Sequence, residues 1–561
     1  MLAAIAIWIE VVAVGKLLHR LLMIAAMAVI AMLSFAVTPR TACAANTGTI
    51  TVGGDVATRY DAYQLFSATV VDGTDADQKV ATDLAWASDA VRQAVLPVLY
   101  DAGFDSSAST AQEAAEWMNA DGHMATALTA KLARAIVKAG AEPVALNAGT
   151  AAELPCGYWL IVADDGAIAQ GEAGTAPIMV LVGGGAVTVK PKAATPKVAK
   201  HVLEDSTAAW QKAADATVAD DLYWRLSATV PAGLSAYDAY TVQFVDTMSA
   251  GLDPSKVAAS MHVYVAAGTD GGFDAVSAGK DGRASSTPAK GWTDITSRCK
   301  VSVDGNAFTV RTGDLIAALG GADAFTAGAR VVAVYNAPLG ANCNRGATKG
   351  NPNEVFLRYP RSPFADQSGD AGFTRTPSDD ATAYTWGLSL IKRSSTNDNP
   401  LAGAKLRITD DRGRTLAAGG TWTTDADAYV VSGEDGRLEL NGVDAGVYTV
   451  EEVAAPKGYT AFEGKRTVTI AADGLDVKQV AAAKPEVTVS AESPLRVDAA
   501  DAGTGSIELS VLNTPSKEAS RGFMPSTGDR TLVLVAALAA IGVAAIVVAL
   551  VIKRGGGRRD K

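Results

Sequence analysis

Three polar side chains in the last third of the chain stand at positions where a strand would carry apolar ones. Side chains two positions apart share one face of a strand. Each polar residue is in phase with apolar neighbours: Lys392 with Leu388 and Leu390, Glu452 with Tyr448 and Val450, and Asn513 with Leu509 and Val511. The alternation therefore predicts that all three side chains point into one core.

These residue types in a core could form a covalent bond. Desolvation favours an uncharged lysine amine, which is a nucleophile, and a protonated carboxyl group, which can stabilise an oxyanion. Attack by Lys392 on the side-chain amide of Asn513, with Glu452 as the acid, would release ammonia and leave an isopeptide bond. The alternative is a buried salt bridge in which the asparagine completes the hydrogen bonds, because unpaired buried charges cost several kcal/mol.

The middle of the chain partly repeats this pattern. Lys200 is in phase with Val198 and Val202, and Asp246 is in phase with Phe244 and Met248. The phase therefore predicts that both side chains point into a core, which makes Lys200 a candidate for a second nucleophile.

The C-terminus carries a short motif before an apolar run. Residues 524–528 read Met-Pro-Ser-Thr-Gly, the run spans residues 531–552, and residues 553–561 form a basic tail. The run is long enough to cross a bilayer, and the basic tail favours the cytoplasmic side. On the run alone, an ordinary membrane anchor is the alternative.

Several motifs together carry a family resemblance. Residues 524–528 resemble the Leu-Pro-x-Thr-Gly sorting signal, in which a sortase cleaves between Thr527 and Gly528 and passes the threonine acyl group to an amine. Residues 448–459 resemble the E-box, Glu-x-x-Ala-Pro-x-Gly-Tyr, and residues 187–192 resemble a pilin motif with Lys192 at its lysine. The chain thus resembles the major (backbone) fimbrial subunits of Gram-positive bacteria, sortase-assembled pilins with isopeptide-forming immunoglobulin-like domains.

The resemblance implies a structural, non-enzymatic protein. Its expected partners are a sortase, neighbouring copies, cell-wall peptidoglycan and host surface molecules, and its expected place is a fimbria anchored to the cell wall. Thr527 would be joined to Lys192 of the next copy, with Lys190 and Lys197 as alternatives in the same linker. A wall-anchored adhesin that acts as a monomer is the first rival, and a tethered secreted enzyme is the second.

The same resemblance implies that Asp246 can serve as the acid in the middle of the chain. It places the second acceptor asparagine just beyond the last strand's tyrosine. Here Tyr359 is followed by Pro360 and Arg361, so the expected asparagine is missing. We therefore expect no bond to Lys200, with Arg361 pairing with Asp246 or another residue accepting. Asn353 is in phase further up that strand, in a different register.

The predicted fold is mostly β, with an α+β domain followed by two immunoglobulin-like sandwiches and a C-terminal transmembrane helix. Strand patterns are short, alternating and separated by Gly, Asp and Pro. The expected order is a signal peptide (1–45), an α+β domain (46–190), a first sandwich (196–375), a second sandwich with the E-box (384–518) and a sorting region (519–561).

The chain length, the net charge and the number of histidines limit the classes of function that the chain can have. The 561 residues are too many for one core, and a net charge of -11 disfavours a nucleic-acid partner. The four histidines show no metal-ligand spacing, so we expect no metal and no cofactor. Once a signal peptide with Cys43 is removed, the sequence allows one disulfide, between Cys299 and Cys343.

Overall fold

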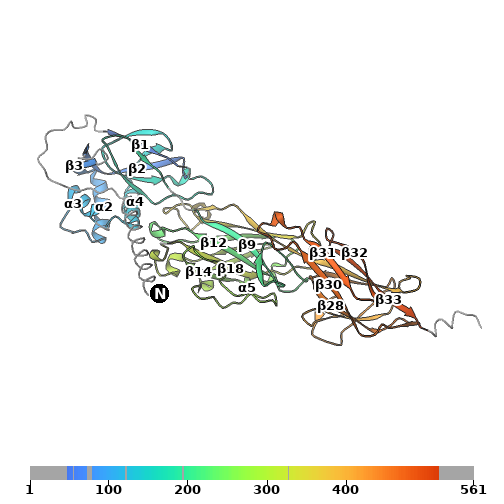
Figure 1. The fold of residues 1–561 in the computed structure, drawn as a ribbon. Coiled ribbons are helices and arrows are strands. Elements are labelled where there is room, and N and C mark those ends of the chain that lie inside the picture. Colours follow the sequence, from blue (N-terminus) through green and yellow to red (C-terminus); the bar gives the residue numbers. More distant parts are fainter. Residues whose placement is uncertain are drawn as a thin grey trace, which may run out of the picture.

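The computed structural model describes residues 47–516, apart from residues 55, 73–78, 121–122, 192–194 and 326. Within these residues the chain forms three successive domains, and the two sandwiches lie end to end in an elongated body (Figure 1). The fold is mostly β. No helix within the described range is both long and apolar enough to cross a membrane. The predicted signal peptide, sorting signal and transmembrane run lie outside the described residues.

The first domain combines helices with two sheets. Its sheets have the strand orders β5-β1-β8 and β3-β2-β6-β7, with β4 beside β2. Thr110 and Glu113 form a capping box at the start of α3. The elements are β1 (Thr47–Val52), β2 (Arg59–Asp72), β3 (Lys79–Trp86), α2 (Asp89–Asp101), α3 (Ala111–Asn119), α4 (Thr126–Lys138), β4 (Val144–Asn147), β5 (Ala151–Pro155), β6 (Gly157–Ala163), β7 (Ile178–Val182) and β8 (Val187–Val189).

The second domain is a sandwich with short helical insertions. One sheet has the order β10-β9-β12-β18-β14-β15, and the facing sheet has the order β11-β21-β19-β13-β17-β16, with β20 beside β19. The elements are β9 (Lys197–Glu204), β10 (Ala209–Gln211), β11 (Ala213–Asp215), β12 (Tyr223–Val230), β13 (Gln243–Met248), α5 (Val257–Ser260), β14 (His262–Ala267), β15 (Thr293–Asp294), β16 (Lys300–Asp304), β17 (Ala307–Arg311), α6 (Leu315–Ala318), β18 (Ala329–Asn336), β19 (Asn351–Pro360), β20 (Phe373–Arg375) and β21 (Asp379–Tyr384).

The third domain is a more compact sandwich. One sheet has the order β27-β22-β33-β29, with β32 beside β33, and the other has the order β25-β24-β23-β28-β30-β31, with β26 beside β23. The elements are β22 (Trp386–Ser394), β23 (Lys405–Thr409), β24 (Thr415–Leu416), β25 (Trp422–Thr423), β26 (Val430–Val431), β27 (Arg437–Val443), β28 (Gly446–Ala454), β29 (Tyr459–Thr460), β30 (Lys465–Asp473), β31 (Glu486–Ala491), β32 (Leu495–Asp501) and β33 (Ser506–Pro515).

The predicted bounds of the two sandwiches leave residues 376–383 unassigned, and most of a strand lies there. Residues 376–383 contribute most of β21, which pairs with β19 and β11, and β22 begins two residues after β21 ends. The indole nitrogen of Trp386 donates a hydrogen bond of 2.7 Å to Asp215, and the guanidinium of Arg414 pairs with Asp220 at 2.7 Å. The two domains are therefore joined directly through side-chain contacts.

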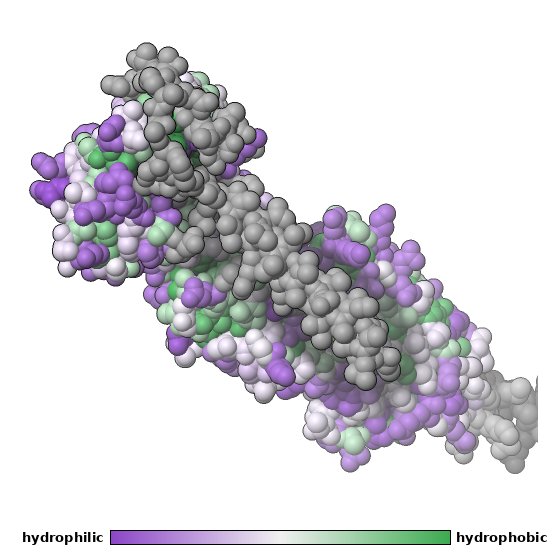
Figure 2. Space-filling model, turned by 60° about the vertical axis from the view of Figure 1, so that its left-hand side comes forward, coloured by the Kyte–Doolittle hydropathy of each residue, from purple (hydrophilic) through white to green (hydrophobic). Residues whose placement is uncertain are grey.

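Apolar side chains fill the interior of each sandwich, and the surface is mixed. Large side chains such as Trp224, Tyr335 and Trp386 are fully buried. On the face shown in Figure 2, hydrophilic and hydrophobic residues are interspersed along all three domains. Polar groups in the two cores are therefore exceptions that require partners.

Candidate functional site

The cluster in the third domain draws on both sheets of the sandwich. Lys392 lies on β22 and Asn513 on β33, which are parallel neighbours: Lys392 stands opposite Val511 and Ser394 stands opposite Asn513. Lys392 and Asn513 are thus offset by two residues and share a face. Glu452 reaches them from β28 in the facing sheet. The exposed fractions are 1% for Lys392, 7% for Glu452 and 2% for Asn513, so all three lie in the core as their phase predicts.

One carboxylate oxygen of Glu452 contacts both partners. Its Oε1 lies 3.1 Å from the Nζ of Lys392 and accepts a hydrogen bond of 2.8 Å from the Nδ2 of Asn513. The Nζ of Lys392 also contacts the Oδ1 of Asn513. The second carboxylate oxygen accepts the backbone N–H of Phe462 at 3.0 Å, which holds the carboxylate in place.

The environment of Lys392 favours its nucleophilic form. Burial lowers the pKa of this lysine from 10.5 to about 8, against the opposing effect of the Glu452 carboxylate. A neutral amine beside an amide carbon can attack it, and the leaving nitrogen then needs a proton. Because Glu452 contacts both nitrogens, it can accept a proton from one and return it to the other.

The cluster in the second domain has a different arrangement. Lys200 lies on β9 in one sheet, whereas Asp246 on β13 and Asn353 on β19 are neighbours in the facing sheet. Tyr335, on β18 in the sheet of Lys200, completes the cluster. All four side chains have an exposed fraction of 0%. A bond between Lys200 and Asn353 would therefore join the two sheets rather than two neighbouring strands.

The Tyr335 hydroxyl lies among the other three groups. It accepts hydrogen bonds from Lys200 Nζ at 3.0 Å and from Asn353 Nδ2 at 2.9 Å, and it donates to Asp246 Oδ2 at 3.1 Å. Lys200 Nζ also pairs directly with Asp246 Oδ2. Burial lowers the pKa of Lys200 to about 8 and raises the pKa of Asp246, so burial shifts each group toward its neutral form.

The pairing of Arg361 with Asp246, one of the two alternatives predicted for the second domain, is wrong. Arg361 does not pair with Asp246; its guanidinium donates to the backbone carbonyl of Asp165 at 3.3 Å. Asn353 stands opposite Met248 in the β13–β19 ladder, two residues from Asp246 along β13, and therefore shares its face. Asn353, which the sequence placed in a different register, is thus the residue whose side-chain amide reaches the cluster.

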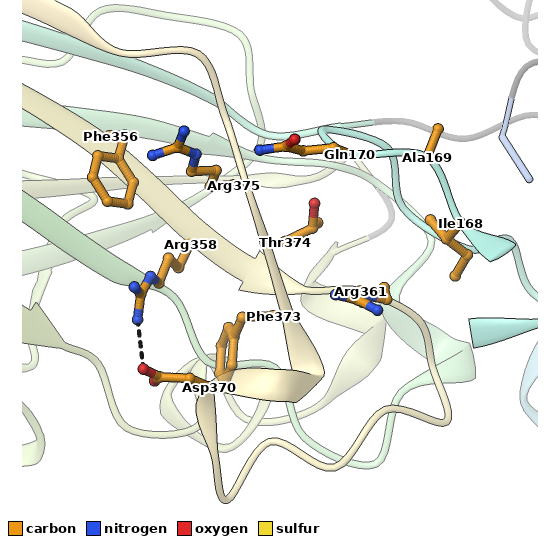
Figure 3. A pocket seen from close by; sticks show the side chains of 10 residues that line it. All are labelled: Ile168, Ala169, Gln170, Phe356, Arg358, Arg361, Asp370, Phe373, Thr374 and Arg375. Carbon is orange, nitrogen blue, oxygen red and sulfur yellow. Dashed lines mark ion pairs between the residues drawn. The ribbon is translucent and has the colours of Figure 1, made fainter. Parts of the chain in front are cut away.

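Arg361 instead lines a cleft where the first and second domains meet. The cleft has a volume of about 480 Å³, and Figure 3 shows the guanidinium groups of Arg358, Arg361 and Arg375 around it. Arg358 forms an ion pair of 3.0 Å with Asp370, drawn as a dashed line in Figure 3. Arg361, which stands where the acceptor asparagine was expected, therefore contributes to the contact between the first and second domains.

The predicted polymerisation residues are only partly described. Lys192, Thr527 and Gly528 lie outside the described residues. Lys190 is exposed directly after β8, whereas Lys197 is the first residue of β9 and pairs with Thr229. Lys197 is thus part of a sheet and not of the linker in which the sequence placed it.

The disulfide that the sequence allowed is absent between Cys299 and Cys343, which are both free. The thiol of Cys299 donates to the backbone carbonyl of Ile295 at 3.3 Å, and burial raises the pKa of both thiols. Within the described residues, no group of three or more His, Cys, Asp or Glu side chains is placed to hold a metal ion.

The third domain matches a known domain family. Residues 387–484 match the family model of SpaA, described as a prealbumin-like fold domain. The match includes Lys392 and Glu452 and ends before Asn513. No curated protein matches the chain.

Among solved structures, the chain resembles major pilins of Gram-positive bacteria. A backbone pilin of Streptococcus pyogenes has 14% sequence identity and a TM-score of 0.46, covering 84% of this chain and 98% of that one. SpaD of Corynebacterium diphtheriae has 14% identity and a TM-score of 0.41 over 84% and 98%. BcpA of Bacillus cereus has 13% identity and a TM-score of 0.38 over 84% and 99%.

Proposed function

We propose that this chain is the structural subunit of a covalently polymerised pilus that is anchored to the cell wall. The carrying observation is that two successive sandwich domains each bury a lysine, a carboxylic acid and an asparagine in one cluster. The three groups touch directly in the third domain, and in the second domain the Tyr335 hydroxyl connects Asn353 to the pair of Lys200 and Asp246. Such a cluster destabilises a core unless its groups are paired or react, because buried charges lose several kcal/mol of solvation. An internal cross-link in each sandwich suits a protein that bears tension.

In the third domain, the proposed reaction joins Lys392 to Asn513. Lys392 Nζ attacks Asn513 Cγ, a new C–N bond forms, and the C–Nδ2 bond breaks with release of ammonia. Glu452 carries the proton from Nζ to the leaving nitrogen and hydrogen-bonds the amide. The reaction occurs once per molecule, so the chain is not an enzyme in the sense of turnover.

In the second domain, the proposed reaction joins Lys200 to Asn353 with Asp246 as the acid. This replaces the sequence-based prediction that no bond forms there. It is supported by the placement of the Asn353 amide, which lies within hydrogen-bonding distance of a hydroxyl that also contacts Lys200.

Assembly of the fibre needs the terminal signal and a linker lysine. We propose that a sortase cleaves between Thr527 and Gly528 and joins the threonine carbonyl to Lys192 of a neighbouring copy. The last copy would be joined to peptidoglycan, and the apolar run 531–552 would hold the precursor in the membrane until cleavage. A linker lysine can enter an enzyme cleft, whereas a lysine within a paired strand such as Lys197 is held by its sheet.

Denaturing electrophoresis of wall extracts tests this assembly. Because Lys192 is the proposed amine, Lys192→Ala should abolish the covalent ladder of the parent, while Lys197→Ala serves as the matched control and should leave it intact. A ladder that survives the combined loss of Lys190, Lys192 and Lys197 contradicts the proposed linkage. A parent chain that shows no ladder would support the monomeric wall-anchored adhesin instead.

A further inference from the structure

The two clusters differ in how far the acid reaches. In the third domain, Glu452 Oε1 contacts both the attacking nitrogen, at 3.1 Å, and the leaving nitrogen, at 2.8 Å. In the second domain, Asp246 is one methylene shorter. Asp246 contacts Lys200, but the leaving nitrogen of Asn353 donates its hydrogen bond to Tyr335.

The Tyr335 hydroxyl occupies the gap that the shorter acid leaves. Its oxygen lies 3.0 Å from the attacking nitrogen of Lys200 and 2.9 Å from the leaving nitrogen of Asn353. Its ring packs edge to face against Phe308, with 4.8 Å between ring centroids, and its residue is fully buried. The hydroxyl is therefore held between the two nitrogens that must exchange a proton.

We propose that Tyr335 relays this proton during bond formation in the second domain, an inference that rests on the proposed bond between Lys200 and Asn353. Neutral Lys200 Nζ attacks Asn353 Cγ, so that the attacking nitrogen has a proton to lose and the leaving nitrogen needs one. Tyr335 takes the proton from Nζ while its own hydroxyl proton, which it donates to Asp246 in the structure, turns to Nδ2 and is given to it. The C–Nδ2 bond then breaks, ammonia leaves, and the phenol is restored.

The surroundings of Tyr335 favour this exchange in a single step. Burial and the Asp246 carboxylate raise the pKa of the phenol well above its usual value, so a free phenolate is disfavoured. A hydroxyl that gives and receives a proton at the same time stays neutral. In the third domain Glu452 contacts both nitrogens and no relay is needed.

The test compares two buried tyrosines of the same sheet. Tyr335→Phe removes the relay hydroxyl. Tyr264→Phe removes a buried hydroxyl that donates to the Ser286 carbonyl at 2.8 Å, away from the cluster. In the exported full-length chain, the cross-linked peptide of Lys200 and Asn353 is followed by mass spectrometry from the time of synthesis.

We expect Tyr335→Phe to slow the formation of this bond by about 100-fold or more, the usual effect of losing a general acid–base group. Tyr264→Phe should form it as fast as the parent. Limited proteolysis shows whether the second domain is folded in each variant, and the bond between Lys392 and Asn513 in the same chain is the internal control. The same two tyrosine changes are also made in an Asp246→Asn chain, which is expected to form no bond in the second domain. Only the structural contributions of the two hydroxyls remain in that chain, and there Tyr335→Phe and Tyr264→Phe should lower the melting temperature by similar amounts.

The outcomes separate the two hypotheses. If the parent forms the bond and Tyr335→Phe forms it equally fast, the relay is refuted and the proposed bond stands. If the parent chain contains no cross-linked peptide of Lys200 and Asn353, the proposed bond in the second domain is refuted, and the relay with it.

Discussion

Replacing Glu452 with glutamine removes the proposed acid and keeps its shape. A glutamine can still accept the backbone N–H of Phe462, but it cannot carry a proton from Lys392 to the leaving nitrogen of Asn513. Glu452→Gln should therefore fold without forming the bond. Its intact mass should be heavier by one ammonia, about 17 Da, than expected for a bonded chain.

The effect on stability follows from the loop that the bond closes. Lys392 and Asn513 are 121 residues apart. Closing a loop of this size is worth about 5 kcal/mol by the chain-entropy estimate used for disulfides. For a domain of roughly 130 residues, an unfolding entropy of about 2.1 cal/mol/K per residue converts this into a fall in melting temperature of roughly 15–20 °C.

The neighbouring glutamate provides the matched control. Glu451 points away from the core and forms an ion pair of 3.0 Å with Arg407, with its side chain 33% exposed. Glu451→Gln makes the same chemical change one residue away and should keep both the mass deficit and the melting temperature to within a few degrees, since exposed ion pairs contribute about 0–1 kcal/mol. Glu452→Ala should also lack the bond, and it adds a cavity. If Glu452→Gln keeps the deficit and the melting temperature of the parent, the three residues are only a buried polar cluster.

Two further predictions concern the same clusters. Asp246→Asn removes the carboxylate that would take the first proton from the Lys200 ammonium and leave the neutral amine that attacks, so the second deficit of about 17 Da should disappear while the one in the third domain remains. Intact mass decides this, and a retained second deficit would argue against Asp246 as the acid. Asn513→Ala should leave Lys392 as a buried amine with a pKa of about 8, against 10.5 in the unfolded chain. Between these two pH values the unfolded chain binds more protons than the folded chain, so the free energy of unfolding rises with pH across that window. Urea unfolding at pH 7 to 10 measures this rise, which is on the order of 3 kcal/mol at full extent; a slope equal to that of the parent, whose lysine is an amide, would contradict it.

Strand alternation in the sequence located the buried polar residues of the third domain, although β22 itself is buried on nearly both faces. Lys392, Glu452 and Asn513 each interrupt a regular apolar series, so their burial could be predicted from the sequence. Their mutual contact could not, because alternation gives the face of a strand but not its neighbours across the sandwich. The parallel pairing of β22 with β33 and the approach of β28 from the other sheet determine that contact.

The acceptor asparagine of the second domain, in contrast, could not be predicted from the sequence. The family pattern directed attention to the residues after Tyr359, where Arg361 stands. The β13–β19 ladder instead places Asn353 opposite Met248 and on the face of Asp246. A shift of register along a strand changes which side chain reaches a site, and only the partner strand determines it.

Tyr335 was not predicted as a functional residue for a related reason. Its strand, β18, is buried on both faces, so almost every side chain from Ala329 to Asn336 is enclosed. Without alternation, nothing in the sequence distinguishes a hydroxyl that faces Asp246 from one that faces a neighbouring strand.

The two proposed bonds would carry tension by different routes. In the third domain the load enters at β22 and leaves at the end of β33, and the proposed bond lies close to the C-terminal ends of both strands. Force would therefore pass along β22, cross to Asn513 and leave the domain, so that nearly all of the sandwich lies outside the load path. In the second domain the load would cross from Lys200 on β9 to Asn353 near the start of β19, and would then still run through β19, β20 and β21 before it reaches β22. Those strands are held by hydrogen bonds and apolar packing, without a covalent link, and can be pulled out, whereas the third domain leaves no comparable segment in series. The second domain is therefore the part of the subunit in which a fibre with both bonds would extend first.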